Sequence, residues 1–411
     1  MALEKLDNSL IKETEALRRE GRIKAQERII VDYIPPRGEK GPRYMIKGVD
    51  REFIRMNSNS YLSLSNHPGL IEAAEAVSKK FGVGPGAVRF ISGTFDCHVA
   101  LEERIARFLG KPAANIFNSA YTSTLGLALA ITNQQTYWIG DELNHNCIIR
   151  AMRIANVPRQ NRAIYKHNNM EELKKCLDEV PSDIERVMII FDGIFSMRGD
   201  YASIDKIVEI AEPYHAKFKD GVITVVDDSH GIGAYGKSGR GTADFVGVQP
   251  DVIIGTFGKA FGVNGGFIAA SEAVTEAVRQ KADTYIYTNP LSAADCAAAI
   301  KAIDLCESAE GLKWSKNLKE MTQYFRNGIE ALRLESIPGP HPIVALLVRD
   351  TAKTHKMVQR LFERGVLVVG LTFPVVPRGD ETIRFQINAA HSKADVDYVL
   401  EVLSEFKNPK A

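Results

Sequence analysis

The chain has 411 residues, of which 45% are hydrophobic and 25% charged, a balance that suits an ordinary globular protein with a sizeable core. Fifty-two Lys and Arg residues against 51 Asp and Glu residues leave a net charge of +1, so no general attraction to nucleic acid or anionic membrane is expected. No apolar run approaches the roughly 20 residues of a membrane span. Five cysteines without a C-x-x-C pair predict a cytoplasmic protein with neither a disulfide framework nor a thiolate zinc site.

The first segment, residues 1–55, is predicted to be a helical arm and a connector. Apolar residues recur among charges at helical spacing and predict an amphipathic helix from Leu3 to about Arg28. The stretch Ile34–Pro42 (IPPRGEKGP) is rich in Pro and Gly, which is typical of a connector.

The middle of the chain, residues 56–291, alternates short apolar runs with helical patterns. Apolar runs without alternation are typical of strands that are buried on both faces, and helices between them indicate parallel crossovers. We therefore predict a large α/β domain with a mainly parallel sheet. Its clearest strands and helices are Val187–Phe191, Val222–Val226, Val252–Ile254, Met170–Glu179 and Ile204–Lys217.

The last part, residues 292–411, is predicted to be a smaller α+β domain. A long helical region extends to Arg333 and is broken near Gly311. Strands and helices then alternate over Ile343–Val348, Ala352–Arg364, Val366–Val369, Thr382–Ile387 and Lys393–Phe406.

One glycine-rich segment matches nucleotide-binding patterns but is rejected. Gly231–Ser238 (GIGAYGKS) fits G-x-x-x-x-G-K-[ST], and its glycines also spell G-x-G-x-x-G. Both patterns need a helix to begin there, because the helix N-terminus and the loop amides jointly bind the phosphates. Gly239 and Gly241 follow at once and two aspartates precede, so we predict a glycine turn without nucleotide.

Three groups of reactive side chains follow the predicted strands: Asp192–Met197 (DGIFSM), Asp227–His230 (DDSH) and Thr256–Lys259 (TFGK). Singly, each has an ordinary explanation, such as a helix cap or a solvated loop. Open α/β sheets bind ligands at the carboxyl ends of their strands, so the groups are expected to meet there. A Lys nucleophile, an acid, an imidazole and hydroxyls are the set that pyridoxal phosphate requires.

At these residues the chain resembles the α-oxoamine synthases, pyridoxal-phosphate enzymes of the fold-type I, aspartate aminotransferase-like architecture. The resemblance extends almost end to end, and the segments ERII, VRFISGT and PVVPRG are most similar to those of glycine C-acetyltransferase. The other matching segments include NSYLSLSNHPGL, DELNHNCII, FDGIFSMRGD, VDDSHGIGAYGKSGRG and GTFGKAFG.

The resemblance implies roles around the cofactor ring. Lys259 would form the Schiff base and, once released, take the α-proton of the amino acid. Asp227 would keep the pyridine nitrogen protonated. His230 and Ser196 would contact the phenolic oxygen, and His145 would stack on the face of the ring and act in catalysis.

The resemblance also implies a phosphate site shared by two subunits of a homodimer. The Thr256 hydroxyl and the backbone amides of Ala120 and Tyr121, at the start of a predicted helix, would bind phosphate. Thr288 aligns with a ligand that comes from the other subunit.

The substrate residues implied are Arg384, which would clamp the carboxylate of the amino acid, and Asn59. Two departures from the family border this region. Ser63 replaces the usual glycine of N-x-Y-L-G-L, and Asn118–Thr124 (NSAYTST) lacks the acid and amide of glycine C-acetyltransferase. Both departures weaken the inference that this chain uses the same pair of substrates as glycine C-acetyltransferase.

We therefore predict an acyltransferase that condenses an amino acid, glycine first, with an acyl-CoA and releases CoA. The choice among glycine, alanine and serine, the acyl-chain length and loss of carbon dioxide remain open. One alternative is another carbanion enzyme such as an aldolase. A catalytically silent partner subunit, which the presence of Lys259 opposes, and a P-loop nucleotide binder are remote. No histidine spacing indicates a metal site.

Overall fold

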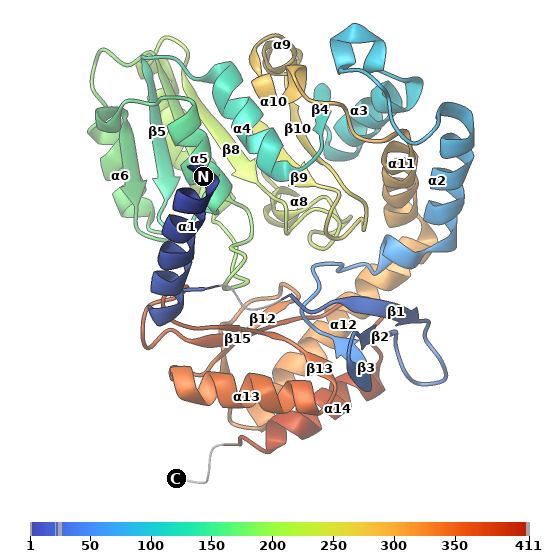
Figure 1. Ribbon diagram of the computed structural model, residues 1–411. Coiled ribbons are helices and arrows are strands. Elements are labelled where there is room, and N and C mark those ends of the chain that lie inside the picture. The colour runs from blue at the N-terminus through green and yellow to red at the C-terminus, as the bar shows by residue number, and fades with distance from the viewer. Residues whose placement is uncertain (1, 21, 24–26, 408–411) are drawn as a thin grey trace.

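The computed structural model describes residues 2–20, 22–23 and 27–407, and a seven-stranded sheet forms its largest layer (Figure 1). The strand order is β4-β10-β9-β8-β7-β5-β6. β10 is antiparallel to both neighbours, and the other pairs are parallel, which confirms the mainly parallel sheet. The strands are β4 (Ala113–Phe117), β5 (Thr136–Asp141), β6 (Arg162–Tyr165), β7 (Arg186–Asp192), β8 (Val222–Asp227), β9 (Val252–Thr256) and β10 (Gly266–Ala270).

Helices cover both faces of this sheet. On β7, Met188 and Ile190 belong to one buried cluster, whereas Val187, Ile189 and Phe191 belong to the other, which explains the continuous apolar run. The first cluster includes side chains of α4 (Ala120–Ile131), α5 (Asn146–Ile154), α9 (Glu272–Lys281) and α10 (Asp283–Ile286). The second includes side chains of α2 (Pro68–Phe81), α3 (Asp96–Leu109), α6 (Met170–Asp178), α7 (Ile204–Ala211) and α11 (Ala293–Glu307).

Two smaller sheets lie below the large one in Figure 1. One has the order β1-β2-β3-β13 and the other β11-β12-β15-β14. Their strands are β1 (Ile30–Ile34), β2 (Arg43–Ile46), β3 (Val49–Arg55), β11 (Glu335–Ser336), β12 (Ile343–Leu347), β13 (Val366–Leu367), β14 (Val369–Leu371) and β15 (Thr382–Gln386). The nearby helices are α12 (Ala309–Ala331), α13 (Thr351–Glu363) and α14 (Lys393–Ser404).

The remaining elements are short: η1 (Leu64–Asn66), η2 (Arg89–Gly93), η3 (Arg159–Asn161), η4 (Glu212–Lys217) and α8 (Thr242–Val246). Pro213 lies two residues after the end of α7, so the helix expected over Ile204–Lys217 changes to a 3-10 turn at Glu212. The expected break near Gly311 lies at Ser308, whose side chain caps α12.

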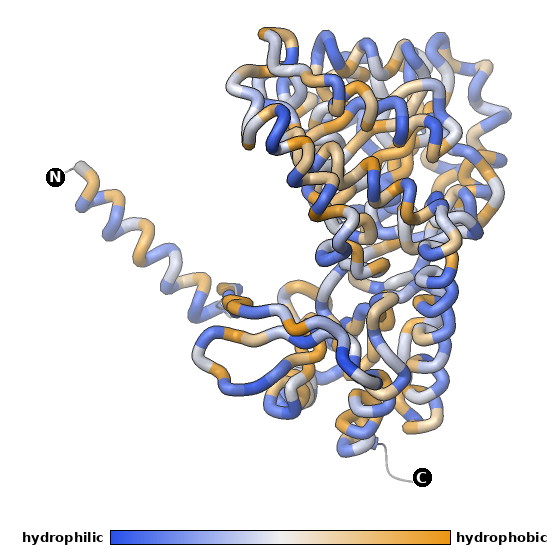
Figure 2. Tube along the Cα trace, turned by 90° about the vertical axis from the view of Figure 1, so that its right-hand side faces the viewer, coloured by the Kyte–Doolittle hydropathy of each residue, from blue (hydrophilic) through white to orange (hydrophobic). Residues whose placement is uncertain are grey.

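The N-terminal segment differs from its prediction. Helix α1 (Ala2–Arg19) ends well before Arg28, and Figure 2 shows it projecting away from the rest of the chain. The predicted connector over Ile34–Pro42 lies between β1 and β2, and β3 pairs in parallel with β13, where Ile54 lies opposite Val366. A partner strand more than 300 residues away leaves no local signal in the sequence.

Candidate active site

The reactive side chains predicted from the strand ends lie at one edge of the large sheet. β7, β8 and β9 are adjacent and parallel. Asp192, the last residue of β7, lies opposite Asp227, the last residue of β8, and Asp227 lies opposite Ile254 of β9. Lys259 follows β9 by three residues, so the amine is brought to the two acids.

Lys259 has the properties of a nucleophile. Desolvation lowers its pKa to about 8, although the charges of Asp227 and Asp192 oppose this shift and Arg384 adds to it. An amine with this pKa is partly neutral near neutral pH, which nucleophilic and general-base chemistry both need.

Asp227 and Asp192 belong to one network with the start of α5. The backbone N–H of His145 donates to Asp192 Oδ2 at 2.9 Å, and the Cys147 thiol donates to Asp227 Oδ2 at 3.5 Å. His145 Nδ1 lies 2.9 Å from Cys147 Sγ. Burial and the charge of Asp227 raise the pKa of Asp192, so Asp192 is disposed to hold a proton beside its neighbour.

His145 is the N-cap residue of α5 and its side chain is exposed. Desolvation lowers its pKa, and the positive charge of Lys259 contributes in the same direction. The ring is thus neutral at physiological pH and accessible, which is compatible with the predicted stacking on a cofactor.

His230 is buried and held from two directions. Its Nδ1 shares a hydrogen bond of 2.8 Å with the Tyr61 hydroxyl, and its carbonyl accepts from His341 Nε2 at 2.9 Å. Desolvation, followed by the charges of Lys259 and Arg384, keeps the pKa of His230 well below its usual value. The imidazole is therefore a fixed neutral group beside Lys259.

Arg384 comes from the small sheet, on β15, and joins this group. Its Nη2 donates to Asn59 Oδ1 at 3.3 Å. Desolvation lowers the pKa of Arg384, and the nearby Tyr61 opposes this shift. Its buried Nε has no hydrogen-bond partner. A half-buried guanidinium with an unused donor is suited to receive a carboxylate.

Ala120 and Tyr121 open α4, as predicted. Ser119 caps the helix: its Oγ accepts from Thr122 N, and its carbonyl accepts from Ser123 N. The first two N–H groups have no acceptor within the helix, and they lie at the positive end of its dipole. They fit a phosphate.

Thr256, at the end of β9, holds the turn that carries Lys259. Its hydroxyl donates to Gly265 O at 2.9 Å and accepts from Gly258 N at 3.0 Å. Thr288 is exposed beyond α10 and donates to Thr284 O, and Ser196 is half-buried in the turn after β7. A phosphate or ring contact for these three residues stays a prediction.

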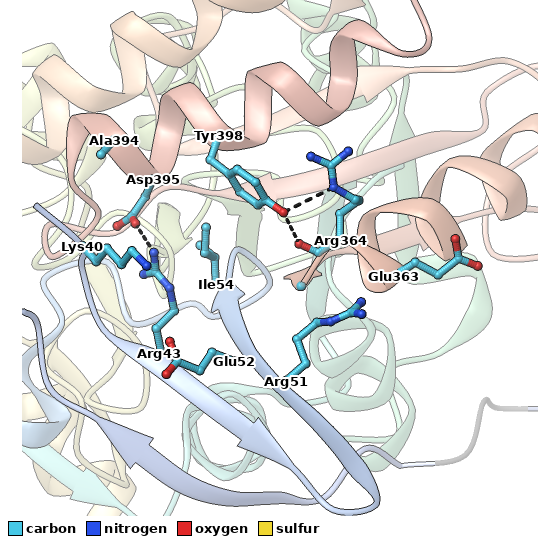
Figure 3. Close-up of a pocket in the computed structure, with 11 residues that line it drawn as sticks. Lys40, Arg43, Arg51, Glu52, Ile54, Glu363, Arg364, Ala394, Asp395 and Tyr398 are labelled. Atoms are coloured by element: carbon cyan, nitrogen blue, oxygen red, sulfur yellow. Dashed lines mark hydrogen bonds and ion pairs between the residues drawn. The ribbon is translucent and has the colours of Figure 1, made fainter.

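Two cavities border the site. One of 480 Å³ is lined by Asn59 and Lys259 together with Asn57, Ser60 and Asn264. A groove of 1650 Å³ includes Asn146, next to His145, and extends along β14 and the loop after it, towards the end of α1. A third cavity of 670 Å³ lies between β2, β3 and α14, around the Arg43–Asp395 ion pair (Figure 3), and contains none of the predicted site residues.

The rejected glycine segment is confirmed as a turn. After β8 the next helix begins only at Thr242 and has five residues. Asp228 accepts from both the backbone N–H (2.6 Å) and the hydroxyl (2.7 Å) of Thr242. A buried carboxylate therefore occupies the centre of the loop, which is unsuitable for phosphate.

Four residues that contact the predicted site residues were missed or given no role from the sequence. Tyr61 and Cys147 stand inside segments that carried the resemblance, and Asp192 opens one of the three groups. His341, which holds the carbonyl of His230, had no signal because it lies in a loop more than 100 residues away. The strand-end position was the signal that could have found Asp192.

Comparison with known proteins agrees with this geometry. The pattern of the family described as "Aminotransferase class I and II" matches residues 51–403. The 8-amino-7-oxononanoate synthase of Thermoanaerobacter pseudethanolicus is 36% identical over 367 residues, which cover 89% of this chain and 90% of the relative. The chain belongs to this aminotransferase family, and within it to the α-oxoamine synthases.

Other relatives support the same assignment. The 8-amino-7-oxononanoate synthase of Thermosipho melanesiensis is 36% identical over 353 residues, covering 85% of this chain and 87% of the relative. A serine palmitoyltransferase from S. paucimobilis, solved with bound pyridoxal phosphate and myriocin, superimposes with a TM-score of 0.84 and 26% identity, covering 98% of this chain and 97% of the other. An 8-amino-7-oxononanoate synthase from Francisella tularensis (TM-score 0.73, 23% identity, covering 86% of this chain and 97% of that one) shares the fold.

The α-oxoamine synthase is thus a pyridoxal-phosphate-dependent acyltransferase with an amino acid and an acyl-CoA as substrates. The residues present fit the cofactor: an amine of lowered pKa, a carboxylate on the adjacent strand and a helix N-terminus for phosphate. Among the described helices, none combines the length and the apolar character needed to cross a bilayer.

Proposed function

We propose that the chain condenses glycine with an acyl-CoA, releasing CoA and forming a β-keto amino acid or, after loss of carbon dioxide, an aminoketone. The observation that carries the proposal is the half-buried Arg384: its Nε has no hydrogen-bond partner, and its charge lowers the pKa of Lys259. The choice of glycine rests on the segments similar to glycine C-acetyltransferase.

Alanine is the second candidate, and the relatives favour it. The 8-amino-7-oxononanoate of their name carries its amino group on the carbon next to a terminal methyl group. That pattern is what alanine leaves after condensation with a seven-carbon acyl group and loss of carbon dioxide.

Four residues would each have a separate role in this reaction. When bound, pyridoxal phosphate supplies the electron sink for the substrate carbanion. Asp227 would hold a proton at the pyridine nitrogen, and Arg384 would bind the substrate carboxylate. Lys259 Nζ would take the α-proton, for which its pKa of about 8 is suited. His145 would cover the cofactor and exclude water from one face.

We also propose that two copies of the chain form a homodimer in the cytoplasm with shared active sites. Tyr287 and Thr288 are exposed just after α10, and η2, which contacts α10, exposes the apolar side chains of Phe90 and Ile91. Exposed apolar groups close to a predicted phosphate ligand support a contact with a second copy.

A CoA-release assay tests the reaction. Purified protein with added pyridoxal phosphate is given glycine, alanine or serine with acyl-CoAs of graded length, and free CoA thiol is measured. We expect release only with both substrates and the highest kcat/KM with glycine. A higher value with alanine favours the second candidate. Aldol cleavage without CoA release would favour the aldolase.

A second experiment tests the cofactor residue. Borohydride treatment followed by peptide mapping should place reduced pyridoxal phosphate on Lys259, and Lys259→Ala should abolish the label. Lys237→Ala is the matched control, since Lys237 is exposed in the glycine turn, and it should label like the parent. A label on Lys237 would contradict the assignment.

A further inference from the structure

Two cysteines outside the active site lie together between α3 and α11. Cys97 is the second residue of α3, and Cys296 is the fourth residue of α11. Both are free thiols. Their sulfurs and a ring nitrogen of His98 all lie within 4.8 Å of one another. A metal ion and a sulfur–sulfur bond are the two chemistries that such a cluster can support.

The hydrogen bonds of His98 argue against a metal ion. Its Nδ1 accepts from Phe95 N at 2.8 Å, and its Nε2 donates to Leu291 O at 2.7 Å. One lone pair is therefore used and the other nitrogen carries a proton. Two thiols alone fall short of the four ligands that structural zinc takes. A disulfide between Cys97 and Cys296 is therefore the chemistry that remains for this cluster.

The two thiols are not equivalent. Cys97 lies at the N-terminus of a 14-residue helix, where the dipole favours a thiolate, and the thiol of Cys296 donates a hydrogen bond that lowers the pKa of Cys97. Cys97 is 7% exposed, whereas Cys296 is fully buried. A small oxidant thus reaches Cys97 first, with Cys296 as its neighbour.

We propose that Cys97 and Cys296 are a redox-active pair that a peroxide converts into a reversible disulfide. The Cys97 thiolate attacks one peroxide oxygen, the O–O bond breaks, and the departing hydroxide takes a proton to form water. Cys296 sulfur then attacks the sulfenic sulfur of Cys97, loses its proton and displaces the second oxygen as water. The two thiols together lose two protons and two electrons, and one peroxide becomes two waters.

A disulfide between Cys97 and Cys296 would link α3 to α11, and the segment before α11 contacts the chain next to the predicted phosphate site. α11 begins two residues after Leu291, the carbonyl partner of His98. Asn289, two residues before Leu291, accepts through its carbonyl from Asn118 Nδ2 at 2.8 Å, and α4 begins at Ala120. The proposal does not depend on the substrate, since the thiols are not part of the reaction site.

Mass spectrometry of the holoenzyme tests the pair. Protein is treated with hydrogen peroxide, the remaining thiols are alkylated, and peptides are analysed without reduction. We expect one linked species that contains Cys97 and Cys296, lighter by two hydrogens than the two separate peptides and reversed by dithiothreitol. Cys176, half-buried on α6, is the internal control and should be alkylated with or without peroxide.

Two variants separate the roles of the thiols. With Cys296→Ser, oxidation of Cys97 should stop at the sulfenic or sulfinic acid. With Cys97→Ser, Cys296 should stay a thiol. The proposal is overturned if peroxide leaves both thiols unlinked in the parent, or if stoichiometric zinc binds to the parent and is lost from both serine variants. The result with the parent requires no variant to fold.

Discussion

At the scale of single residues, Asp227 is the group on which the electronics of the site depend. It ends β8 and is 6% exposed, and its Oδ1 accepts from Ser229 N at 3.1 Å. Asp227→Asn keeps the shape and loses the charge. A charge-assisted hydrogen bond contributes about 1.5–3 kcal/mol, so we expect turnover to fall about 10- to 100-fold while cofactor still binds. Absorbance titration with pyridoxal phosphate and steady-state CoA release measure the two effects separately. Turnover within a few-fold of the parent would refute the role.

Arg384 is the residue on which substrate orientation is expected to depend. A planar guanidinium can hold both carboxylate oxygens, whereas Lys keeps only the charge. Arg384→Lys should leave cofactor absorbance unchanged, weaken amino-acid binding and lower kcat at saturating substrate, each by about tenfold, the equivalent of 1.4 kcal/mol. Arg360→Lys is the matched control, because Arg360 is also half-buried but lies on α13, where it pairs with Glu405. An unaltered KM and kcat in the Arg384 variant would mean that the carboxylate is held elsewhere.

At the scale of elements, the start of α4 depends on a glycine in β10. A Cβ added to Gly266 would lie 2.2 Å from Ala120 N and 2.3 Å from Ser119 C. Gly266→Ala must therefore push back the first turn of α4, where phosphate is expected to bind. We expect weaker cofactor affinity, by about tenfold or more, in a fluorescence titration. Gly84→Ala, where the added Cβ meets nothing within 4 Å, should bind like the parent.

A charged histidine ties β5 to the turn after β7. His167 Nδ1 lies 3.1 Å from Asp141 Oδ1, and Nε2 lies 3.1 Å from Asp200 Oδ2. Its ring packs against Phe195, the neighbour of Ser196. Burial alone would lower the pKa of His167, but the two carboxylates raise it to about 9.

This raised pKa gives the stability a defined pH dependence. A folded-state pKa above the ordinary value of 6.5 stabilises the fold fully below about pH 6.5, and the contribution disappears as pH rises through about 9. His167→Asn should cost about 2 kcal/mol of unfolding free energy near pH 6 and much less near pH 10. Urea unfolding at both pH values measures this, with the exposed His355→Asn as control. An equal loss at both pH values would show that the effect is packing alone.

The sequence predicted the elements whose signals are local. β8 and β9 were found from their apolar runs, and Lys259 and Asp227 from their positions at the strand ends. The pairing of β3 with β13 and the link from His341 to His230 depend on residues that meet only in the fold. Helix α1 ends earlier than its charge and apolar pattern indicated, because such a pattern records a preference and not a boundary.

At the scale of the whole molecule, the predicted site combines residues from the large sheet region and from one of the small sheets. Asp227 ends β8 of the large sheet and Lys259 follows β9, whereas Arg384 comes from β15 in a small sheet. The division into residues 1–55, 56–291 and 292–411 remains our proposal, and β1–β3 join the smaller unit through β13.

The proposed sharing of active sites between two copies leads to a complementation test. If Thr288 binds phosphate in the partner's site, each site combines Lys259 of one chain with Thr288 of the other. Lys259→Ala alone should be inactive, and Thr288→Asp should be nearly so, because its carboxylate repels phosphate. The two variants, co-expressed with different tags and purified through both, form a heterodimer with one complete site. We expect about half of the parent activity per dimer.

Lys259→Ala paired with Arg384→Ala is the matched control. Arg384 contacts Asn59 of its own chain, so neither site is complete and activity should not return. A heterodimer of the first pair that is no more active than its parents would place Thr288 outside the partner's site.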